Sequence, residues 1–322
     1  MTAESERVLV TGGCGFVGAN LVPRLERAGY TVRILDNLSR GRREFLAGCD
    51  AEIHEGDIRD ADAVVRAMDG TDRVIHLAAY GSVVESVSDP DNNFDINALG
   101  TLRVLEGARD AGVKRFVFAS TGGALIGEAE PPVNEDSAPR PKSPYGASKL
   151  AGEGYCHAFA GSYGLPTVML RFGNVYGPVS AHKKGAVTVF CKALMRDEPI
   201  RIFGDGTASR DFLHTEDLCA GIESALAADL APATVLHLAM GREVTIAELA
   251  DVLRRAAGKP DHPIEYAGTR PGEVHRNFAS HDRATDTLGF RPRVALETGM
   301  QRTWEWFADQ GDAALNMETT DS

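Results

Sequence analysis

The chain alternates short apolar runs with longer segments of helical spacing. The first run, Arg7 to Thr11, precedes a glycine-rich turn; apolar positions then recur at helical spacing from Ala19 to Ala28, and a second run, Thr31 to Asp36, ends in an acid. Further strand-like runs cover residues 51–54, 73–77, 115–120 and 167–171, separated by helical stretches such as 95–111. This alternation predicts an α/β fold built on a doubly wound parallel sheet.

The glycine-rich turn, Thr11-Gly-Gly-Cys-Gly-Phe-Val-Gly18, lies between the first strand and the first helix, and Asp36 closes the second strand. Strand, glycine turn, helix, strand and acid, in this order, are typical of a dinucleotide-binding Rossmann βαβ unit. Ligands on such sheets bind beyond the carboxyl ends of the strands. Ser120-Thr121 and Phe172-Gly-Asn174 fall at such ends, so we expect them at the site.

The regular alternation loosens after about residue 178. A strand-like run at Pro199 to Phe203 leads into a Gly-Asp-Gly turn, and helical spacing recurs near 215–227 and 245–257. We therefore expect a Rossmann domain over residues 1–178 and a smaller C-terminal substrate-binding domain over 179–310 that partly returns to the sheet. The polar, acidic residues 311–322 are expected to form a flexible tail.

Composition restricts the class of protein. The 322 residues are 43% hydrophobic and 25% charged, as in an ordinary globular enzyme, and a net charge of -12 argues against a nucleic-acid partner. No apolar run approaches the ~18 residues of a membrane span, and the polar N-terminus lacks the core of a signal peptide. Five scattered cysteines and nine histidines show no metal-binding spacing. We expect a cytoplasmic protein without a membrane partner or a metal.

Tyr145 and Lys149 form a candidate for proton transfer. Residues four apart on a helix share one face, so the Lys149 ammonium is expected near the Tyr145 phenol, where it favours the ionised form. A free tyrosine titrates near ~10 and is a poor base at neutral pH. A fixed cation and a positively charged nicotinamide would both lower that pKa. The pair therefore predicts a base beside a hydride acceptor.

These features, with several further motifs in the same order, carry a resemblance over residues 7–307. The motifs are the glycine turn, Asp36-Asn-Leu-Ser39, Gly56-Asp-Ile58, His76-Leu-Ala-Ala79, Asn97, Ser120-Thr-Gly-Gly123, Ser143 to Lys149, Arg171 to Pro178, Gly204-Asp-Gly206, Arg210-Asp-Phe212 and Arg270-Pro-Gly-Glu273. The chain resembles the extended short-chain dehydrogenase/reductases that act on nucleotide sugars, and within them the UDP-glucose 4-epimerases most closely.

The resemblance implies a tightly bound NAD. The residues it assigns to the cofactor are Gly12, Gly15, Phe16, Val17, Gly18, Asp36, Asn37, Ser39, Asp57, Ile58, Leu77, Ala78, Ala79, Asn97, Ser120, Tyr145 and Lys149. Among them Asp36 is expected to bind the adenosine ribose and to repel the 2′-phosphate of NADP. Arg42 and Arg43, a few residues further on, would weaken that preference.

The resemblance also implies a reaction and a substrate class. Tyr145 takes the proton of the sugar 4-hydroxyl, Thr121 steadies that hydroxyl, and the hydride goes to NAD and returns to the other face of a rotated 4-keto sugar. Asn174 is assigned to the diphosphate or the sugar of the substrate, and Arg210 and Arg270 are assigned to the diphosphate. Asn277 stands where a gate for sugar substituents is expected, and a small residue there leaves room for an N-acetyl group. Relatives form homodimers through helices equivalent to 97–111 and 145–160.

Several alternatives stay open at this stage. Ile126 stands where relatives commonly have a tyrosine, which implies either altered substrate choice or a repacked wall, and either Ser120 or Thr121 faces the sugar, with Thr121 favoured. Gly122-Gly123 replaces the acids that a dehydratase or decarboxylase needs after the threonine. The other candidate functions are a UDP-glucuronate or UDP-N-acetylhexosamine epimerase, a 2-epimerase and, remotely, a non-catalytic NAD-binding protein. The basic stretch His182-Lys-Lys184 would favour a uronic acid.

Overall fold

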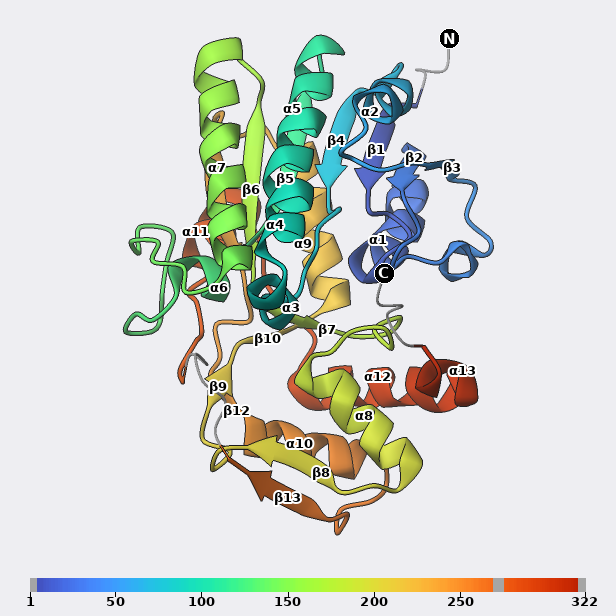
Figure 1. The fold of residues 1–322 in the computed structure, drawn as a ribbon, viewed down its shortest axis with the longest axis vertical. Helices are drawn as coiled ribbons and strands as arrows, with labels where there is room; N and C mark the ends of the chain where they lie inside the picture. Colours follow the sequence, from blue (N-terminus) through green and yellow to red (C-terminus); the bar gives the residue numbers. More distant parts are fainter. Residues whose placement is uncertain (1–4, 269–274, 318–322) are drawn as a thin grey trace.

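A computed structural model describes residues 5–268 and 275–317 and is built on one seven-stranded sheet. The strand order is β11-β6-β5-β4-β1-β2-β3, and every pairing is parallel (Figure 1). The strands are β1 (Arg7–Thr11), β2 (Thr31–Asp36), β3 (Glu52–Glu55), β4 (Arg73–His76), β5 (Arg115–Thr121), β6 (Thr167–Phe172) and β11 (Thr234–Leu238). The order reverses between β1 and β4, where doubly wound sheets bind their ligands. The predicted fold class is confirmed.

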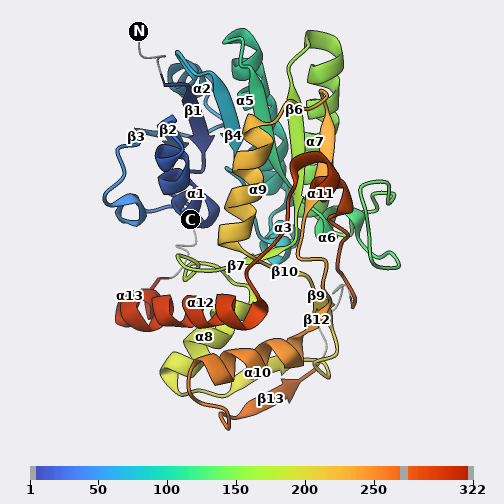
Figure 2. The same cartoon turned by 180° about the vertical axis from the view of Figure 1, so that it is seen from behind.

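Helices cover both faces of this sheet. On one face lie α2 (Ala61–Met68), α5 (Gly100–Asp110) and α7 (Pro144–Tyr163), and on the other lie α1 (Phe16–Arg27), α9 (Thr215–Ala227) and α11 (Asp282–Leu288) (Figures 1 and 2). Because both faces are covered, the strands are near-continuous apolar runs: Val8, Leu9 and Val10 of β1 are fully buried.

Shorter elements line the carboxyl ends of the strands. They are η1 (Arg43–Leu46), α3 (Val83–Ser88), α4 (Pro90–Phe94), the π-helical turn η2 (Asp95–Leu99), α6 (Gly123–Ile126), and the parallel pair β7 (Asn174–Tyr176) and β10 (Phe212–His214). Single π-helical turns inside helices are frequent at functional sites. This edge of the sheet therefore carries most of the irregular backbone of the larger unit.

A smaller unit lies beyond this edge (Figure 1). It contains the parallel pair β8 (Ile200–Phe203) and β13 (Ile264–Ala267), the antiparallel pair β9 (Ser209–Arg210) and β12 (Val244–Thr245), and the helices α8 (Ala186–Arg196), α10 (Ile246–Ala256) and α12 (Leu296–Gln310). Its own core includes the fully buried Leu194, Leu249 and Met300.

The chain does not divide at a single point. Residues after 178 supply α9, which packs against α1, and β11, which pairs with β6. The expected flexible tail differs from the structure over its first residues: Asp312–Leu315 form α13, and Ala314 and Met317 are buried in the core of the smaller unit. In the described part of the chain, no helix is long and apolar enough to cross a membrane.

Candidate functional site

The glycine turn between β1 and α1 is shaped by close backbone approaches. Gly12 has φ +70, and a β-carbon there would come 2.7 Å from the backbone nitrogen of Ala78, which follows β4. Gly15 is the N-cap of α1; no side chain caps this helix start, and its first turn contains no acid. Its backbone N–H groups are therefore available to an anion. A dinucleotide pyrophosphate fits this arrangement.

Asp36 ends β2 beside the glycine turn. Its carboxylate accepts hydrogen bonds from the backbone nitrogens of Cys14 (2.9 Å) and Leu38 (2.8 Å) and is only 7% exposed. Burial raises the pKa of this carboxyl, and the two backbone N–H groups act in the opposite direction. Each carboxylate oxygen retains a further lone pair, so Asp36 can still accept from a ribose hydroxyl. Arg43, which was expected to weaken the preference for NAD, forms an ion pair with Glu55 (2.9 Å).

The other residues assigned to the cofactor lie along the same edge of the sheet. Asn37 donates to Asp57 (2.9 Å) and accepts from the Ser39 hydroxyl (2.7 Å), so the loops after β2 and β3 are held together. The Ile58 side chain is buried against Gly100. The Asn97 side chain, within η2, accepts from the backbone N–H of Tyr80 (2.7 Å) and donates to Ser148 of α7 (3.0 Å). The loop after β4 is thereby tied to the helix that carries Tyr145.

Tyr145 lies in the first turn of α7, next to Thr121 at the end of β5. Ser143 caps this turn by accepting from the backbone N–H of Gly146 (3.2 Å), and Ser86 accepts from that of Tyr145 (3.1 Å). Burial raises the pKa of Tyr145 to about 12, whereas the Thr121 hydroxyl, as a hydrogen-bond donor, acts in the opposite direction. The sequence predicted a pKa below the ordinary value for Tyr145. The structure gives the opposite direction, because desolvation of the phenol is the largest effect.

Lys149 lies one turn further along α7 and is 3% exposed. Its ammonium donates to the carbonyl oxygen of Ala119 (2.8 Å) and lies 4.9 Å from the ring centroid of Phe118, and the structure shows no hydrogen bond between Lys149 and Tyr145. Burial lowers the pKa of Lys149 to about 8. The shared helix face is as expected, but the cation is anchored to β5 rather than to the phenol.

Ser120 and Thr121, at the end of β5, contact different residues of α7. The Ser120 hydroxyl donates to Glu153 (2.6 Å) and is buried, whereas Thr121 lies next to Tyr145. The geometry therefore favours Thr121 over Ser120 as the hydroxyl that faces a sugar.

Glu153 and Arg171 behind Ser120 were not singled out as site residues. They form a bidentate ion pair, with nitrogen–oxygen distances of 2.9 and 2.8 Å, and both are almost fully buried. Glu153 follows Lys149 by four residues and so lies on the same face of α7. A charged side chain at that position was the sequence signal that could have identified this pair. The pair fixes the end of β5 against α7 and thereby helps to position Thr121.

Residues expected at the substrate side lie on the smaller unit and the segments that lead to it. Asn174 is exposed at the start of β7, and its backbone N–H donates to the carbonyl of Asp211 (2.7 Å). Arg210, in β9, donates to the carbonyl of Ser209 (2.7 Å). Arg270 and Glu273 lie outside the described residues. Asn277 is half-buried and so close to Gly123 that a β-carbon at Gly123 would overlap its amide nitrogen.

Ile126 is part of a small apolar cluster. It is 1% exposed and packs with Leu125, Val133, Ala239 and Ala279. Of the two explanations that the sequence left open, this packing favours a rebuilt wall.

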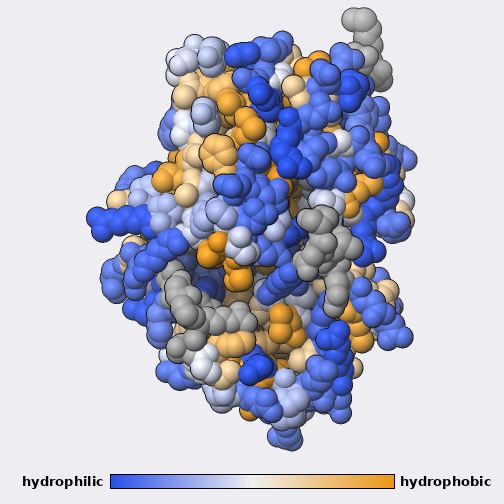
Figure 3. Space-filling view, viewed as in Figure 1, coloured by the Kyte–Doolittle hydropathy of each residue, from blue (hydrophilic) through white to orange (hydrophobic). Residues whose placement is uncertain are grey.

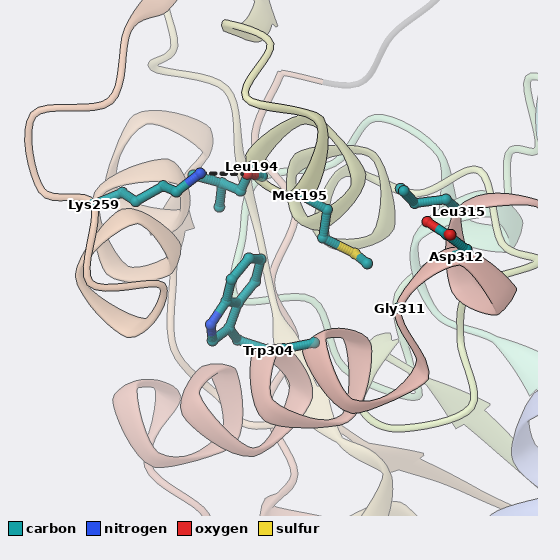
Figure 4. Close-up of a pocket in the computed structure, with 8 residues that line it drawn as sticks. Leu194, Met195, Lys259, Trp304, Gly311, Asp312 and Leu315 are labelled. Carbon is teal, nitrogen blue, oxygen red and sulfur yellow. Dashed lines mark hydrogen bonds between the residues drawn. The ribbon is translucent and has the colours of Figure 1, made fainter.

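A cavity of about 330 Å³ lies elsewhere, between α8, α12 and α13 (Figure 4). Leu194, Met195 and Trp304 line it, and Lys259 donates to the carbonyl of Leu194 (2.8 Å) at its rim. It contains none of the residues assigned to cofactor or substrate.

Similarities to known proteins agree with this geometry. Residues 8–239 match the model of the NAD dependent epimerase/dehydratase family. A UDP-glucose 4-epimerase from Mycolicibacterium smegmatis is 37% identical over 312 residues, which cover 94% of this chain and 99% of the relative. The structure of a UDP-glucose 4-epimerase from Thermotoga maritima with UDP-glucose is similar with a TM-score of 0.90 and 36% identity, covering 94% of this chain and 99% of that one.

A third relative has another sugar in its name. The structure of a UDP-N-acetylglucosamine 4-epimerase from Methanobrevibacter ruminantium is similar with a TM-score of 0.90 and 31% identity, and the match covers 95% of this chain and 99% of that one. The matched family, the fold and the glycine turn with Asp36 all indicate the same cofactor, which is NAD. The chain belongs to the NAD-dependent epimerase/dehydratase family.

Proposed function

We propose that this protein is a nucleotide-sugar 4-epimerase of the UDP-glucose/UDP-galactose type. The observation that carries the proposal is the pairing of Thr121 with Tyr145, followed by Gly122-Gly123 where no acid is present. A tyrosine and a threonine suffice to remove and return one proton at a hydroxyl. Elimination of water would need a further acid that the turn after β5 does not supply.

Each residue has a distinct task in this proposal. Tyr145 takes the proton of the 4-hydroxyl and later returns it, and the Thr121 hydroxyl orients the oxygen that loses it. Bound NAD supplies a reversible hydride acceptor. Lys149, one turn further along α7, has its ammonium held at the Ala119 carbonyl and places a fixed positive charge beside the cofactor.

The substrate side is proposed to admit more than plain hexoses. Arg210 and Arg270 are assigned to the diphosphate, since guanidinium groups suit phosphate oxygens, and Asn174 is assigned to the diphosphate or the sugar. Asn277, next to Gly123 and thus close to Thr121, is the candidate gate for sugar substituents. An asparagine leaves more room than a tyrosine would, and its amide can bond an acetamido group.

The test is turnover of defined substrates by the purified enzyme. Incubation with UDP-glucose is expected to give UDP-galactose until equilibrium, with no net change in NAD, and UDP-N-acetylglucosamine is expected to react as well. UDP-glucuronate and TDP-glucose measured in parallel decide among the alternatives. A protein that binds NAD and epimerises none of these would contradict the proposal and favour a non-catalytic role.

We also propose a homodimer formed through α5 and α7. Large apolar side chains are exposed near these helices: Val84 (72%), Val87 (64%), Phe94 (60%) and Tyr163 (57%). Figure 3 shows hydrophobic surface over α3 and between α5 and α7. Exposed patches of this kind mark interaction surfaces.

Light scattering after size exclusion tests the dimer. The wild type should have twice the mass of one chain, and Phe94→Glu should be a monomer. The control Val189→Glu, on α8, should remain a dimer, and a monomeric wild type would contradict the proposal.

A further inference from the structure

One carboxylate joins three segments that are far apart in the sequence. Glu85 of α3 accepts from Arg40, in the loop after β2, at 2.6 Å and from Lys184, in the segment between β7 and α8, also at 2.6 Å. Arg40 follows Asp36 by four residues, and α3 follows the loop after β4. We call these three residues the Glu85 bridge; it connects both loops that flank the glycine turn with the start of the smaller unit.

The Glu85 bridge is well fixed at its centre. The Glu85 side chain is only 15% exposed, and although burial opposes it, the hydrogen bonds from Lys184 and Arg40 hold the pKa of this carboxyl at about 2. The Arg40 guanidinium also lies over the ring of Tyr80, 4.4 Å from its centroid. Tyr80 directly follows Leu77 to Ala79, so the bridge lies beside residues that are assigned to the cofactor.

Lys183, which precedes Lys184 of the bridge, places its ammonium near the start of α1. Its ammonium lies 6.0 Å from the ring centroid of Phe16, the first residue of α1 after Gly15. Figures 1 and 2 both show the segment between β7 and α8 beside α1. Lys183 is exposed, and within the described part of the chain no carboxylate oxygen lies within 4.0 Å of its ammonium. An anion bound at the helix start would give this ammonium a charged partner.

The segment that carries Lys183 is held in place by its own hydrogen bonds. The backbone N–H of Lys183 donates to the carbonyl of Ser180 (2.9 Å), which also accepts from the Thr188 hydroxyl (3.0 Å). The preceding His182 is buried and stacks on Phe45, with 6.1 Å between ring centroids. The three side chains of this basic stretch lie near Phe45, Phe16 and Glu85, so its preference for a uronic acid stays a prediction.

We propose that the Lys183 ammonium binds the pyrophosphate of NAD, and that the Glu85 bridge holds the segment carrying Lys183 over the cofactor. The uncapped start of α1 meets the diphosphate with backbone N–H groups, and a lysine is a strong point-charge partner for phosphate. The smaller unit thus contributes to cofactor retention as well as to substrate binding. NAD release then requires the bridge to open.

The experiment measures cofactor binding rather than turnover. Lys183→Met is compared with the wild type and with Lys114→Met, which removes the same charge from a surface lysine that pairs with Glu6 and Asp72. Affinities for NAD, ADP-ribose and adenosine are measured by calorimetry on protein freed of its cofactor. A charged hydrogen bond of ordinary strength predicts a loss of about tenfold or more for NAD and ADP-ribose in Lys183→Met and none for adenosine. Lys114→Met should bind as the wild type does.

Two further measurements test the Glu85 bridge separately from the proposed contact between Lys183 and the pyrophosphate. Glu85→Gln should speed the release of NAD from the purified holoenzyme while circular dichroism shows an unchanged fold, and raised salt should do the same in the wild type. The proposal is overturned if Lys183→Met binds NAD and ADP-ribose within twofold of the wild type. It is also overturned if the variant loses affinity for UDP but not for ADP-ribose, since the segment would then serve the substrate.

Discussion

The side-chain amide of Asn277 packs directly against the α-carbon of Gly123. A β-carbon at position 123 would overlap the Asn277 amide, so the two positions are sterically coupled. Gly123 follows Thr121 by two residues, and Gly146, which follows Tyr145, packs against the carbonyl of Ala124. The residue at 277 therefore forms part of the wall beside the proposed reacting groups, although it comes from the far end of the chain.

Enlarging this residue is expected to narrow the pocket. Asn277→Tyr should lower kcat/KM for UDP-N-acetylglucosamine relative to UDP-glucose by at least about tenfold, because the wall then excludes the acetamido group. Asn277→Ala, which keeps the space, is the control and should retain the N-acetyl sugar. Rejection of that sugar by the wild type, or an unchanged preference in Asn277→Tyr, would contradict the assignment.

Removing the Tyr145 hydroxyl tests the proposed base. Tyr145→Phe should lower kcat at least ~100-fold, the usual lower range for general base catalysis, while NAD stays bound. Tyr155→Phe removes a hydroxyl from an exposed position of the same helix and should have no effect. Turnover of Tyr145→Phe close to that of Tyr155→Phe would mean that another group takes the proton.

The sequence was most informative where local pattern and local structure coincide. The runs at Arg7–Thr11 and Thr31–Asp36 are strands with the predicted bounds, and the glycine turn lies between them, because apolar runs and glycines are visible in the local sequence. Contacts between distant segments were not predictable. The partner of Lys149 proved to be the Ala119 carbonyl, and the Lys183 segment proved to lie beside α1, because both depend on how separate elements pack.

Asp36 provides a test of cofactor choice. If Asp36 binds the adenosine ribose as proposed, a 2′-phosphate would add like charge beside its carboxylate, so NADP is expected to bind at least about a hundredfold more weakly than NAD. Asp36→Asn removes the charge and keeps an acceptor for one of the backbone N–H groups that Asp36 now satisfies. Titration of stripped protein should show the gap between NAD and NADP shrink in this variant. Equal affinities in the wild type would instead assign the readout to Arg42 or Arg43.

A chain of hydrogen bonds through His76 links the glycine turn to α5 and η2. The Thr11 hydroxyl lies 2.6 Å from Nδ1 of His76, and Nε2 lies 3.0 Å from the hydroxyl of Thr101, which donates to the carbonyl of Asn97. Because Thr101 already donates, Nε2 is the protonated nitrogen and Nδ1 accepts from Thr11. A neutral imidazole completes the chain, and a doubly protonated one would break it.

The last prediction concerns acid stability. Burial, together with the nearby Lys149, lowers the pKa of His76 to about 3, below the ~6.5 of an exposed histidine. Between these values the unfolded chain binds the proton and the folded one does not, so the stabilisation is complete above pH ~6.5 and declines as the pH falls towards 3. At pH 5 this histidine alone should remove about 2 kcal/mol of unfolding free energy. Urea unfolding at pH 7.5 and 5.0 with saturating NAD should show a smaller difference for His76→Gln than for the wild type, whereas the variant His157→Gln, at an exposed position of α7, should match the wild type. An unchanged difference in His76→Gln would show that this histidine is not held neutral.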